Sequence, residues 1–244
     1  VAPIGGAKDE LAPKIESITV SSDSKDSNEK TIKFVFDEYI QLNNWEDYFY
    51  ISPPVKKSKK KINGNLLLLT IIDSLDENTS YNICLNSCIK DNNEGNILDT
   101  LNYIYNDQNS ELLSGQLVDA YTLKELENFW IMLFNEQIND SLIFKSPPIY
   151  ISKTDKNGLY HFPNLKSKKY KLVALNGYDF IYNNDELIAF SDKIINSKTD
   201  SFITLFAFNP QIDNEKLDSS LINYSLDTLI SENEISNYGQ IEII

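Results

Sequence analysis

The sequence predicts an all-β fold of two consecutive β-sandwich domains, followed by an irregular C-terminal tail. Apolar residues recur mostly with period two, in short runs that polar turns separate, and this pattern is typical of strands. The chain has 244 residues, which is enough for two ordinary domains. The stretch 106–110 contains no apolar residue and divides the strand patterns into two series, so we place the domain boundary there.

The first series predicts strands with one buried face. Ile32, Phe34 and Phe36 alternate with polar or smaller residues and therefore share one side of a strand. A Lys-rich strand and a Leu-rich strand over 60–70 form a predicted hairpin. Asn63 and Gly64 occupy its tight turn, because both residue types tolerate positive φ. The predicted strands after the Lys-rich one cover residues 66–69, 81–89 and 101–105.

The second series predicts another small sandwich. Its turn over 155–158 contains Asn157 and Gly158, and both tolerate the left-handed conformation that such a turn needs. From residue 209 the pattern weakens, and only 240–244 alternates again. The predicted strands of the second domain cover residues 113–118, 129–134, 149–152, 159–162, 170–175, 187–190 and 202–208.

These patterns divide the chain into four segments. Residues 1–13 form an N-terminal linker, 14–107 the first sandwich, 112–208 the second, and 209–244 a tail or the start of a further domain. Residues 217–244 carry apolar residues at spaced positions, which a linker without binding function would not need. The segment is nevertheless too polar to fold alone. We therefore expect this last segment to bind a partner.

The composition excludes several classes of function. The chain has 22 basic residues, all of them Lys, against 36 acidic ones, and a formal net charge of -14. Without Arg the chain has no planar guanidinium group, which binds phosphate through two parallel hydrogen bonds. The excess of negative charge also argues against nucleic acid as a partner. His161 is the only histidine, so no two-His metal site exists within the chain, and we expect it on an exposed strand. We expect a protein that is not an enzyme.

The two cysteines, Cys84 and Cys88, are expected to be free thiols. If both lie on one strand, four residues separate them by about 13 Å, roughly twice the Cα distance that a disulfide tolerates. The same strand would place them on one face, so we expect buried thiols that behave as small apolar groups.

The first half contains an opening with Gly5, Gly6, Lys8 and Asp9, a strand that ends in Phe36 to Tyr39, and a loop from Asp91 to Asn96. These motifs resemble a known family, the Bacteroidota outer-membrane lipoproteins that carry a bacterial Ig-like domain. The family usually has Pro where this chain has Ala7 and Ala12. The resemblance implies an Ig-like sandwich and a lipid anchor on a Cys just upstream of Val1, at the periplasmic or the cell-surface face. The residues that carry it are Gly5, Gly6, Lys8, Asp9, Pro13, Lys14, Phe36, Asp37, Glu38, Tyr39, Ile51, Ser52, Pro53, Pro54, Leu75, Asn78, Thr79, Tyr81, Asp91, Asn92, Asn93, Glu94, Gly95 and Asn96.

The second half contains Gly115 in its first strand, the turn with Asp155 and Gly158, and Tyr160 directly after that turn. These residues resemble the carboxypeptidase regulatory-like, transthyretin-type sandwich. That lipoprotein family pairs the two modules in this order, and neither module is normally an enzyme. The resemblance implies an accessory or scaffold subunit of an outer-membrane β-barrel complex for protein export, assembly or transport. The residues that carry it are Gly115, Val118, Ala120, Thr154, Asp155, Gly158, Tyr160, Asn164, Leu165, Tyr170 and Ala174.

A surface carbohydrate-binding module is the alternative function. Trp45 is flanked by Asn43, Asn44, Glu46 and Asp47, so we expect it to be an exposed platform on which sugars stack. The second tryptophan, at position 130, lies in the apolar run 129–133 and is expected in the core.

The loop before residue 187 is a candidate calcium site. Asp179, Asn183 and Asp185 supply oxygen side chains of the kind that calcium binds, and the resembling family carries a fuller acidic loop here. Aromatic residues interrupt the series, so a solvated acidic loop is the other interpretation. No other cofactor is expected.

A single run of five lysines, in residues 56–61, could touch lipid headgroups or an acidic partner. Alternatively, it protects an edge strand from aggregation, since charged edges discourage pairing with another chain.

Overall fold

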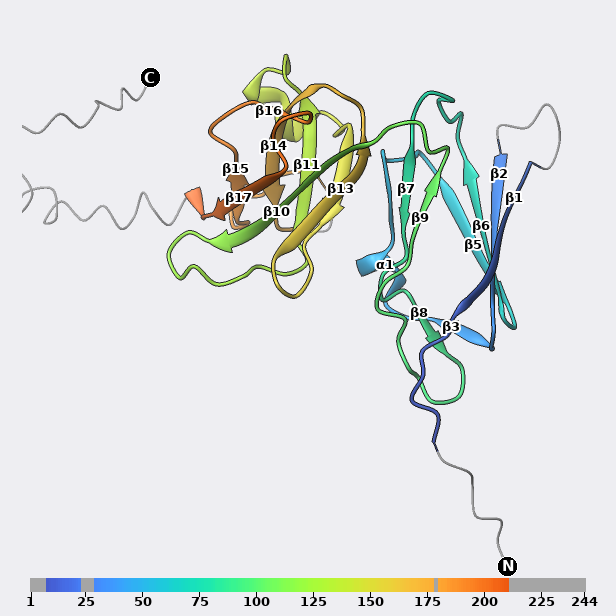
Figure 1. Cartoon of the computed structure of the whole chain (residues 1–244). Coiled ribbons are helices and arrows are strands. Elements are labelled where there is room, and N and C mark those ends of the chain that lie inside the picture. Colours follow the sequence, from blue (N-terminus) through green and yellow to red (C-terminus); the bar gives the residue numbers. More distant parts are fainter. Residues whose placement is uncertain (1–7, 23–28, 178–179, 211–244) are drawn as a thin grey trace, which may run out of the picture.

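The structure is a computed structural model that describes residues 8–22, 29–177 and 180–210. Within these residues the chain is almost entirely β, which confirms the predicted all-β class. The predicted C-terminal tail, including its partner-binding segment 217–244, lies outside the described residues except for 209 and 210. Figure 1 shows two bodies side by side, the first formed by β1 to β9 and the second by β10 to β17. No helix in the described part of the chain is long and apolar enough to cross a membrane.

The first half is a sandwich in which the sheet β1-β2-β6-β5 packs against the sheet β4-β7-β9. Its core confirms the predicted buried face, because Ile32, Phe34 and Phe36 are fully buried. A two-stranded ribbon, β3-β8, lies at one end (Figure 1). The elements are β1 (Ile15–Ser22), β2 (Glu29–Phe36), β3 (Ile40–Leu42), α1 (Trp45–Tyr48), β4 (Tyr50–Ser52), β5 (Ser58–Asn63), β6 (Leu66–Ile72), β7 (Tyr81–Cys84), β8 (Ile89–Asp91) and β9 (Asn102–Tyr105).

The predicted hairpin is present, but its turn lies one residue further along the chain. Asn63 pairs with Leu66 as the last residue of β5, so the turn consists of Gly64 and Asn65. Gly64 has φ of 64°, which glycine adopts without strain. The side-chain amide of Asn65 donates to the carbonyl of Phe36 at 2.8 Å, which ties the turn to β2.

The expectation that the two cysteines share one strand is wrong. β7 ends at Cys84, and a turn with Ser87 at φ of 57° leads into β8, with the N–H of Cys88 donating to the carbonyl of Leu85. Both thiols are nevertheless free and buried, as predicted. The polar pair Asn86–Ser87 is the local signal for this turn, since such residues favour turns over strands.

The second half places the sheet β13-β10-β17 against the sheet β12-β11-β14-β15, with β16 also pairing with β14. β10 pairs antiparallel with β13 but parallel with β17. The elements are β10 (Glu111–Asp119), β11 (Trp130–Asn135), the 3-10 helix η1 (Asp140–Lys145), β12 (Tyr150–Lys153), β13 (Leu159–Leu165), β14 (Lys169–Leu175), β15 (Ile188–Phe190), β16 (Ile195–Asn196) and β17 (Phe202–Ala207).

Both faces of the sheet around β11 are covered, which explains its unbroken apolar run. Ile131 and Leu133 face the core between the two sheets. Trp130, Met132 and Phe134 face the opposite side, where η1 and Tyr50 of the first half pack on them. A strand that is buried on both faces needs apolar residues at every position. Trp130 is therefore a core residue, as predicted.

The two halves meet where an edge strand of each lies beside the other. The hydroxyl of Ser52 in β4 accepts the backbone N–H of Ile151 in β12 at 3.0 Å. The ring of Tyr50 packs edge-on against Trp130, with ring centroids 5.9 Å apart. The ammonium of Lys153 donates to the carbonyl of Asp47 at 2.5 Å. Each sheet edge is thereby protected by the other half.

The polar stretch 106–110 connects β9 to β10 and is fixed to both halves. The hydroxyl of Ser80 accepts the backbone N–H groups of Gln108 and Asn109 at 2.8 and 3.0 Å. From the second half, the amide of Asn164 donates to the carboxylate of Asp107 and to the carbonyl of Asn109. The polar side chains of this connection hold it in place through hydrogen bonds.

Gly115 in β10 occupies a position where the chain has no room for a side chain. The hydroxyl of Tyr160 donates to the carbonyl of Ile203 at 2.8 Å, directly over this glycine. A Cβ at Gly115 would lie 1.9 Å from that carbonyl oxygen and 2.3 Å from the Tyr160 hydroxyl. The glycine therefore permits the bond that links β13 to β17 across β10.

We predict that Gly115→Ala destabilises the second half, because the added methyl group forces the Tyr160 hydroxyl and β17 apart. The expected loss is about 1–3 kcal/mol in the free energy of unfolding, as for overpacked cores. Urea denaturation followed by tryptophan fluorescence measures it. Ser114→Ala in the same strand is the control and should change the stability by less than about 0.5 kcal/mol. Equal stability of the two variants would contradict the packing argument.

Candidate functional site

The expected exposure of Trp45, on which the sugar-binding hypothesis depends, is wrong. Its side chain is only 7% exposed and belongs to the core of the first half. One face of the indole stacks on Phe49 with ring centroids 4.2 Å apart, and the ammonium of Lys60 lies 4.9 Å from the ring centroid. The polar neighbours of Trp45 in sequence point elsewhere because α1 turns the indole inward.

The candidate calcium loop is only partly described. Asp179 lies outside the described residues, while Asn183 and Asp185 are exposed. The carboxylate of Glu186 accepts the backbone N–H of Asn183 at 2.8 Å, so it closes the loop on itself. No group of three or more His, Cys, Asp or Glu side chains in the described residues could hold a metal ion. The calcium site remains a prediction.

The Lys-rich run begins just before β5 and continues into it, and β5 is an edge strand of its sheet. Lys59 and Lys61 are exposed, and Lys60 contacts both Glu46, at 2.5 Å, and the Trp45 ring. This placement agrees with the interpretation of these lysines as protection of an open edge.

The single histidine and the two thiols lack the surroundings of catalytic groups. His161 is exposed on β13, as predicted, and its Nδ1 lies 3.0 Å from the hydroxyl of Ser114. Burial raises the pKa of Cys84, and burial together with the nearby Cys84 raises the pKa of Cys88 to about 12. Both thiols are therefore protonated at neutral pH, which makes them poor nucleophiles.

The loop after β8, one of the motifs of the Ig-like resemblance, is built around Asp91. This carboxylate accepts four backbone N–H groups, from Asn93, Glu94, Gly95 and Asn96, at 2.6 to 3.0 Å. Burial alone would raise the pKa of Asp91, but these hydrogen bonds outweigh it and lower the pKa to about 2. Asp91 is thus a structural anchor of its loop, with both oxygens engaged by the backbone.

The open edge of β17 is the feature most suited to binding. β17 is the last strand of the sheet β13-β10-β17. On its inner side, the carbonyl of Ser201, just before β17, accepts the N–H of Ser114 in β10 at 2.9 Å. The carbonyl of Ala207 accepts the N–H of Ala120, just after β10, at 2.8 Å. Backbone groups alternate in direction along a strand, so those of Phe202, Thr204 and Phe206 point to the open side. These outward groups have no backbone partner among the described residues.

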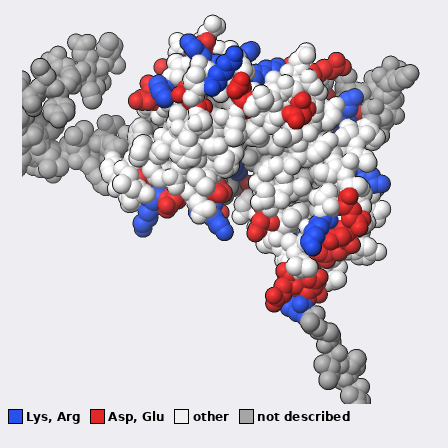
Figure 2. All heavy atoms as spheres, in the orientation of Figure 1, with Lys and Arg blue, Asp and Glu red and all other residues white. Residues whose placement is uncertain are grey.

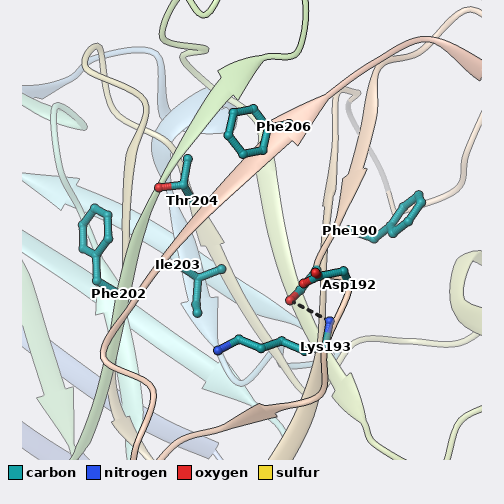
Figure 3. A pocket seen from close by; sticks show the side chains of 8 residues that line it. Phe190, Asp192, Lys193, Phe202, Ile203, Thr204 and Phe206 are labelled. Atoms are coloured by element: carbon teal, nitrogen blue, oxygen red, sulfur yellow. Dashed lines mark hydrogen bonds between the residues drawn. The ribbon is translucent and has the colours of Figure 1, made fainter. Parts of the chain in front are cut away.

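A groove runs along this edge, between β17 and the segment that follows β15. At one end of the groove, Ile188 of β15 is bridged to Phe208, the residue after β17. Their backbones exchange two hydrogen bonds of 2.9 Å. Beyond the bridge lies an opening of about 450 Å³. Figure 3 shows Phe190 across the groove from β17 and the side chain of Lys193 extending toward Ile203.

Exposed aromatic side chains surround the groove. Phe190, Phe202 and Phe206 are 59%, 55% and 51% exposed, which is unusual for phenylalanine in a folded domain. Ile203, Leu205 and Ala207 point to the opposite face of β17, toward the core. The signal in the sequence is the run 202–208, which is apolar on both faces although it forms an edge strand. We predicted a strand over 202–208 but did not identify it as an edge.

The geometry can accept an extended polypeptide. An added strand would pair with the outward backbone groups, and its side chains would pack beside Phe202 and Phe206 as cross-strand neighbours. Near the far end, Lys193 is paired with Asp200 at 3.2 Å. The apolar groove therefore has a fixed polar border.

Comparison with known families identifies the first half. Residues 9–105 match the family model described as a bacterial Ig-like domain. This agrees with the sandwich of β1 to β9 and with the Ig-like part of the predicted fold. No curated protein matches the chain significantly.

Several solved structures of Gram-positive pilins are distantly similar to the chain. The major pilin subunit of Bacillus cereus shares 9% identity at a TM-score of 0.27, covering 74% of this chain and 64% of the pilin. The pilus 2b backbone protein of group B streptococcus shares 12% identity at a TM-score of 0.25, covering 78% and 96%. The chain thus spans less than two thirds of the Bacillus cereus pilin.

We predict a pH-dependent effect of Asp91→Asn on thermal stability. The pKa of Asp91 lies below its ordinary value of 3.8, at about 2, so the folded state favours the charged form. Its contribution is complete above the unfolded pKa and is lost as the pH falls through the folded value. The wild-type protein should therefore have the higher Tm at pH 7, and the difference should shrink as the pH falls from about 4 to about 2.

Thermal melts by circular dichroism measure this difference. Glu16→Gln, at an exposed position of β1, is the matched loss of one negative charge. It should leave the Tm nearly unchanged at both ends of the range. A Tm difference for Asp91→Asn that stays constant down to about pH 2 would contradict the role of the carboxylate.

Proposed function

We propose that the chain is a non-catalytic module of the bacterial cell envelope that binds a partner polypeptide by strand addition at the edge of β17. The observation that carries this proposal is the row of outward backbone groups at Phe202, Thr204 and Phe206, bordered by exposed aromatic rings. Main-chain hydrogen bonds supply affinity in such complexes, and pockets for alternate side chains supply specificity.

The shape of the groove favours a strand over a small molecule. The groove is open along its length. The free N–H and C=O groups along β17 repeat at the spacing of a strand, so the backbone of another strand can pair with all of them. Apolar residues at alternate positions of the partner would cover Phe202 and Phe206, which otherwise remain in water at a free-energy cost. The occupant is thus an extended segment with alternating apolar side chains.

The cellular setting follows from the lipoprotein resemblance of the first half. In our proposal a lipid anchor holds the protein at the outer membrane, where it serves as accessory subunit of a β-barrel complex in export, assembly or transport. The match of residues 9–105 to a bacterial Ig-like domain supports an extracytoplasmic scaffold. The partner strand then belongs to the β-barrel protein or to another envelope subunit.

Two alternatives have less support. An enzyme would need catalytic groups, whereas the only histidine is exposed beside a serine hydroxyl and both thiols have raised pKa values. Sugar binding at Trp45 would need an open indole face, whereas that side chain is 7% exposed. We therefore expect the isolated chain to show no hydrolase activity and no polysaccharide retention that depends on Trp45.

We predict that Thr204→Pro abolishes partner binding while the protein stays folded. Proline removes an N–H that points away from β10, so the bonds between β10 and β17 remain. The measurement is purification of the natively expressed protein in mild detergent, followed by mass spectrometry of stoichiometric partners. A β-barrel protein should accompany the wild-type chain and be lost with the proline variant.

Thr204→Ala is the matched control, because it removes the same side chain but keeps the N–H, and it should retain the partner. Phe206→Ser should weaken the complex at least tenfold, because the variant lacks the aromatic ring that the partner strand would cover. Circular dichroism melts verify that each variant is folded. Retention of the partner by folded Thr204→Pro would overturn the proposal.

A further inference from the structure

A second concave region lies between the two halves and is rich in lysine. It has a volume of about 740 Å³ and is lined by loops from the ends of both sandwiches. Four lysines line it, at positions 166, 168, 169 and 198, against only two carboxylates, Asp76 and Glu136. Figure 2 shows lysine side chains gathered over the end of the second half that carries β14 and β16. A basic cleft is unexpected in a chain of net charge -14.

The backbone that carries these lysines is fixed by buried hydrogen bonds. Ser197 is only 3% exposed, and its hydroxyl accepts the N–H of Lys168 at 3.0 Å. The same hydroxyl lies 3.1 Å from the carbonyl of Lys166. The buried hydroxyl of Tyr170 donates to this carbonyl as well, at 2.9 Å. The lysines therefore project from a preorganised turn, which lowers the entropic cost of binding a ligand.

Three of the four ammonium groups are available to a ligand. Lys166 is engaged by Asp76 of the first half at 3.1 Å. Lys168, Lys169 and Lys198 are exposed and form no ion pair with the described residues. At physiological salt, charges beyond about 8 Å are largely screened, so the acidic surface far from the cleft weakens the field of these lysines little.

Besides the lysines and the two carboxylates, the lining contains uncharged hydrogen-bonding side chains. Asn135, Gln137 and Asn196 line the cleft with amides that both donate and accept. The aromatic rings of its lining are not available for stacking, since Tyr150 is 3% and Tyr170 1% exposed. A nucleic acid would find neither exposed rings for its bases nor Arg for its phosphates. A ligand that carries hydroxyl groups between its carboxylates suits this lining better, because the hydroxyl groups can bond to the amides and the carboxylates to the lysines.

We propose that this cleft binds an acidic polysaccharide. Carboxylate groups of the sugar chain would pair with Lys168, Lys169 and Lys198, and its hydroxyl groups would bond to the amides of Asn135, Gln137 and Asn196. The cleft is open to solvent rather than enclosed, so a polymer can pass through it. This site lies apart from β17 and uses none of the residues proposed for strand addition.

Isothermal titration calorimetry of the full chain with a hexameric oligogalacturonate tests the proposal. The fully methyl-esterified hexamer, which has the same length without charge, is the control ligand. The triple variant K168Q/K169Q/K198Q should weaken binding about tenfold, because three exposed charge contacts together contribute about one decade in affinity. Binding should also weaken as the salt concentration rises.

A matched variant separates the cleft from general surface charge. K57Q/K59Q/K61Q removes the same number of charges from exposed lysines on β5 and directly before it, and should change the affinity less than about twofold. Equal weakening by both triple variants, or equal binding of the esterified hexamer, would overturn the proposal. So would the absence of binding to the wild type, or tighter binding of a single-stranded oligonucleotide. Partner recovery in the Thr204 experiment is independent of all these outcomes.

Discussion

The arrangement of the molecule depends on the contact between β4 and β12, where an edge strand of each half covers the other. This contact buries polar groups, and its stability rests on how well they are paired. Burial lowers the pKa of Lys153, while its ammonium is held by the carbonyl of Asp47 and by the side-chain oxygen of Asn128 at 2.5 and 2.9 Å. The same ammonium lies 4.4 Å from the centroid of the Trp130 ring. The backbone N–H of Ile151 also donates to the side-chain hydroxyl of Ser52. Together these contacts fix one orientation of the two sandwiches.

Three kinds of sheet edge follow from this arrangement. β4 and β12 protect each other, and β5 carries exposed lysines that discourage pairing. The edge of β17 has neither protection: its outward backbone groups are open and its outer face presents Phe202, Thr204 and Phe206. An edge with these properties is a liability unless a partner covers it. This contrast within one molecule is the physical reason for assigning the binding function to β17.

The basic cleft is lined by residues of both halves. Its lysines belong to the second half, whereas Asp76, which orients Lys166, belongs to a turn of the first. Hydrogen bonds to Thr79 and Asn78, together with Lys166, lower the pKa of Asp76 to about 2, so its charge persists at any physiological pH. Anchoring of the connection 106–110 to Ser80 on one side and Asn164 on the other completes this rigid junction.

The sequence by itself determined the strands, because the alternation of apolar residues is a local property that burial of one face imposes. It also determined the all-β class, the core positions of Phe34 and Trp130 and the Ig-like motifs around Asp91. Only the tertiary structure decided the rest, because it depends on contacts between distant residues. Trp45 has polar neighbours in sequence but is buried by Phe49 and Lys60. The parallel pairing of β17 with β10 leaves one edge open. Lysines 166 and 198 line one cleft because the buried hydroxyl of Ser197 ties their two segments together. Local periodicity carries no information about which strand becomes an edge, and edges and clefts are where this protein can bind.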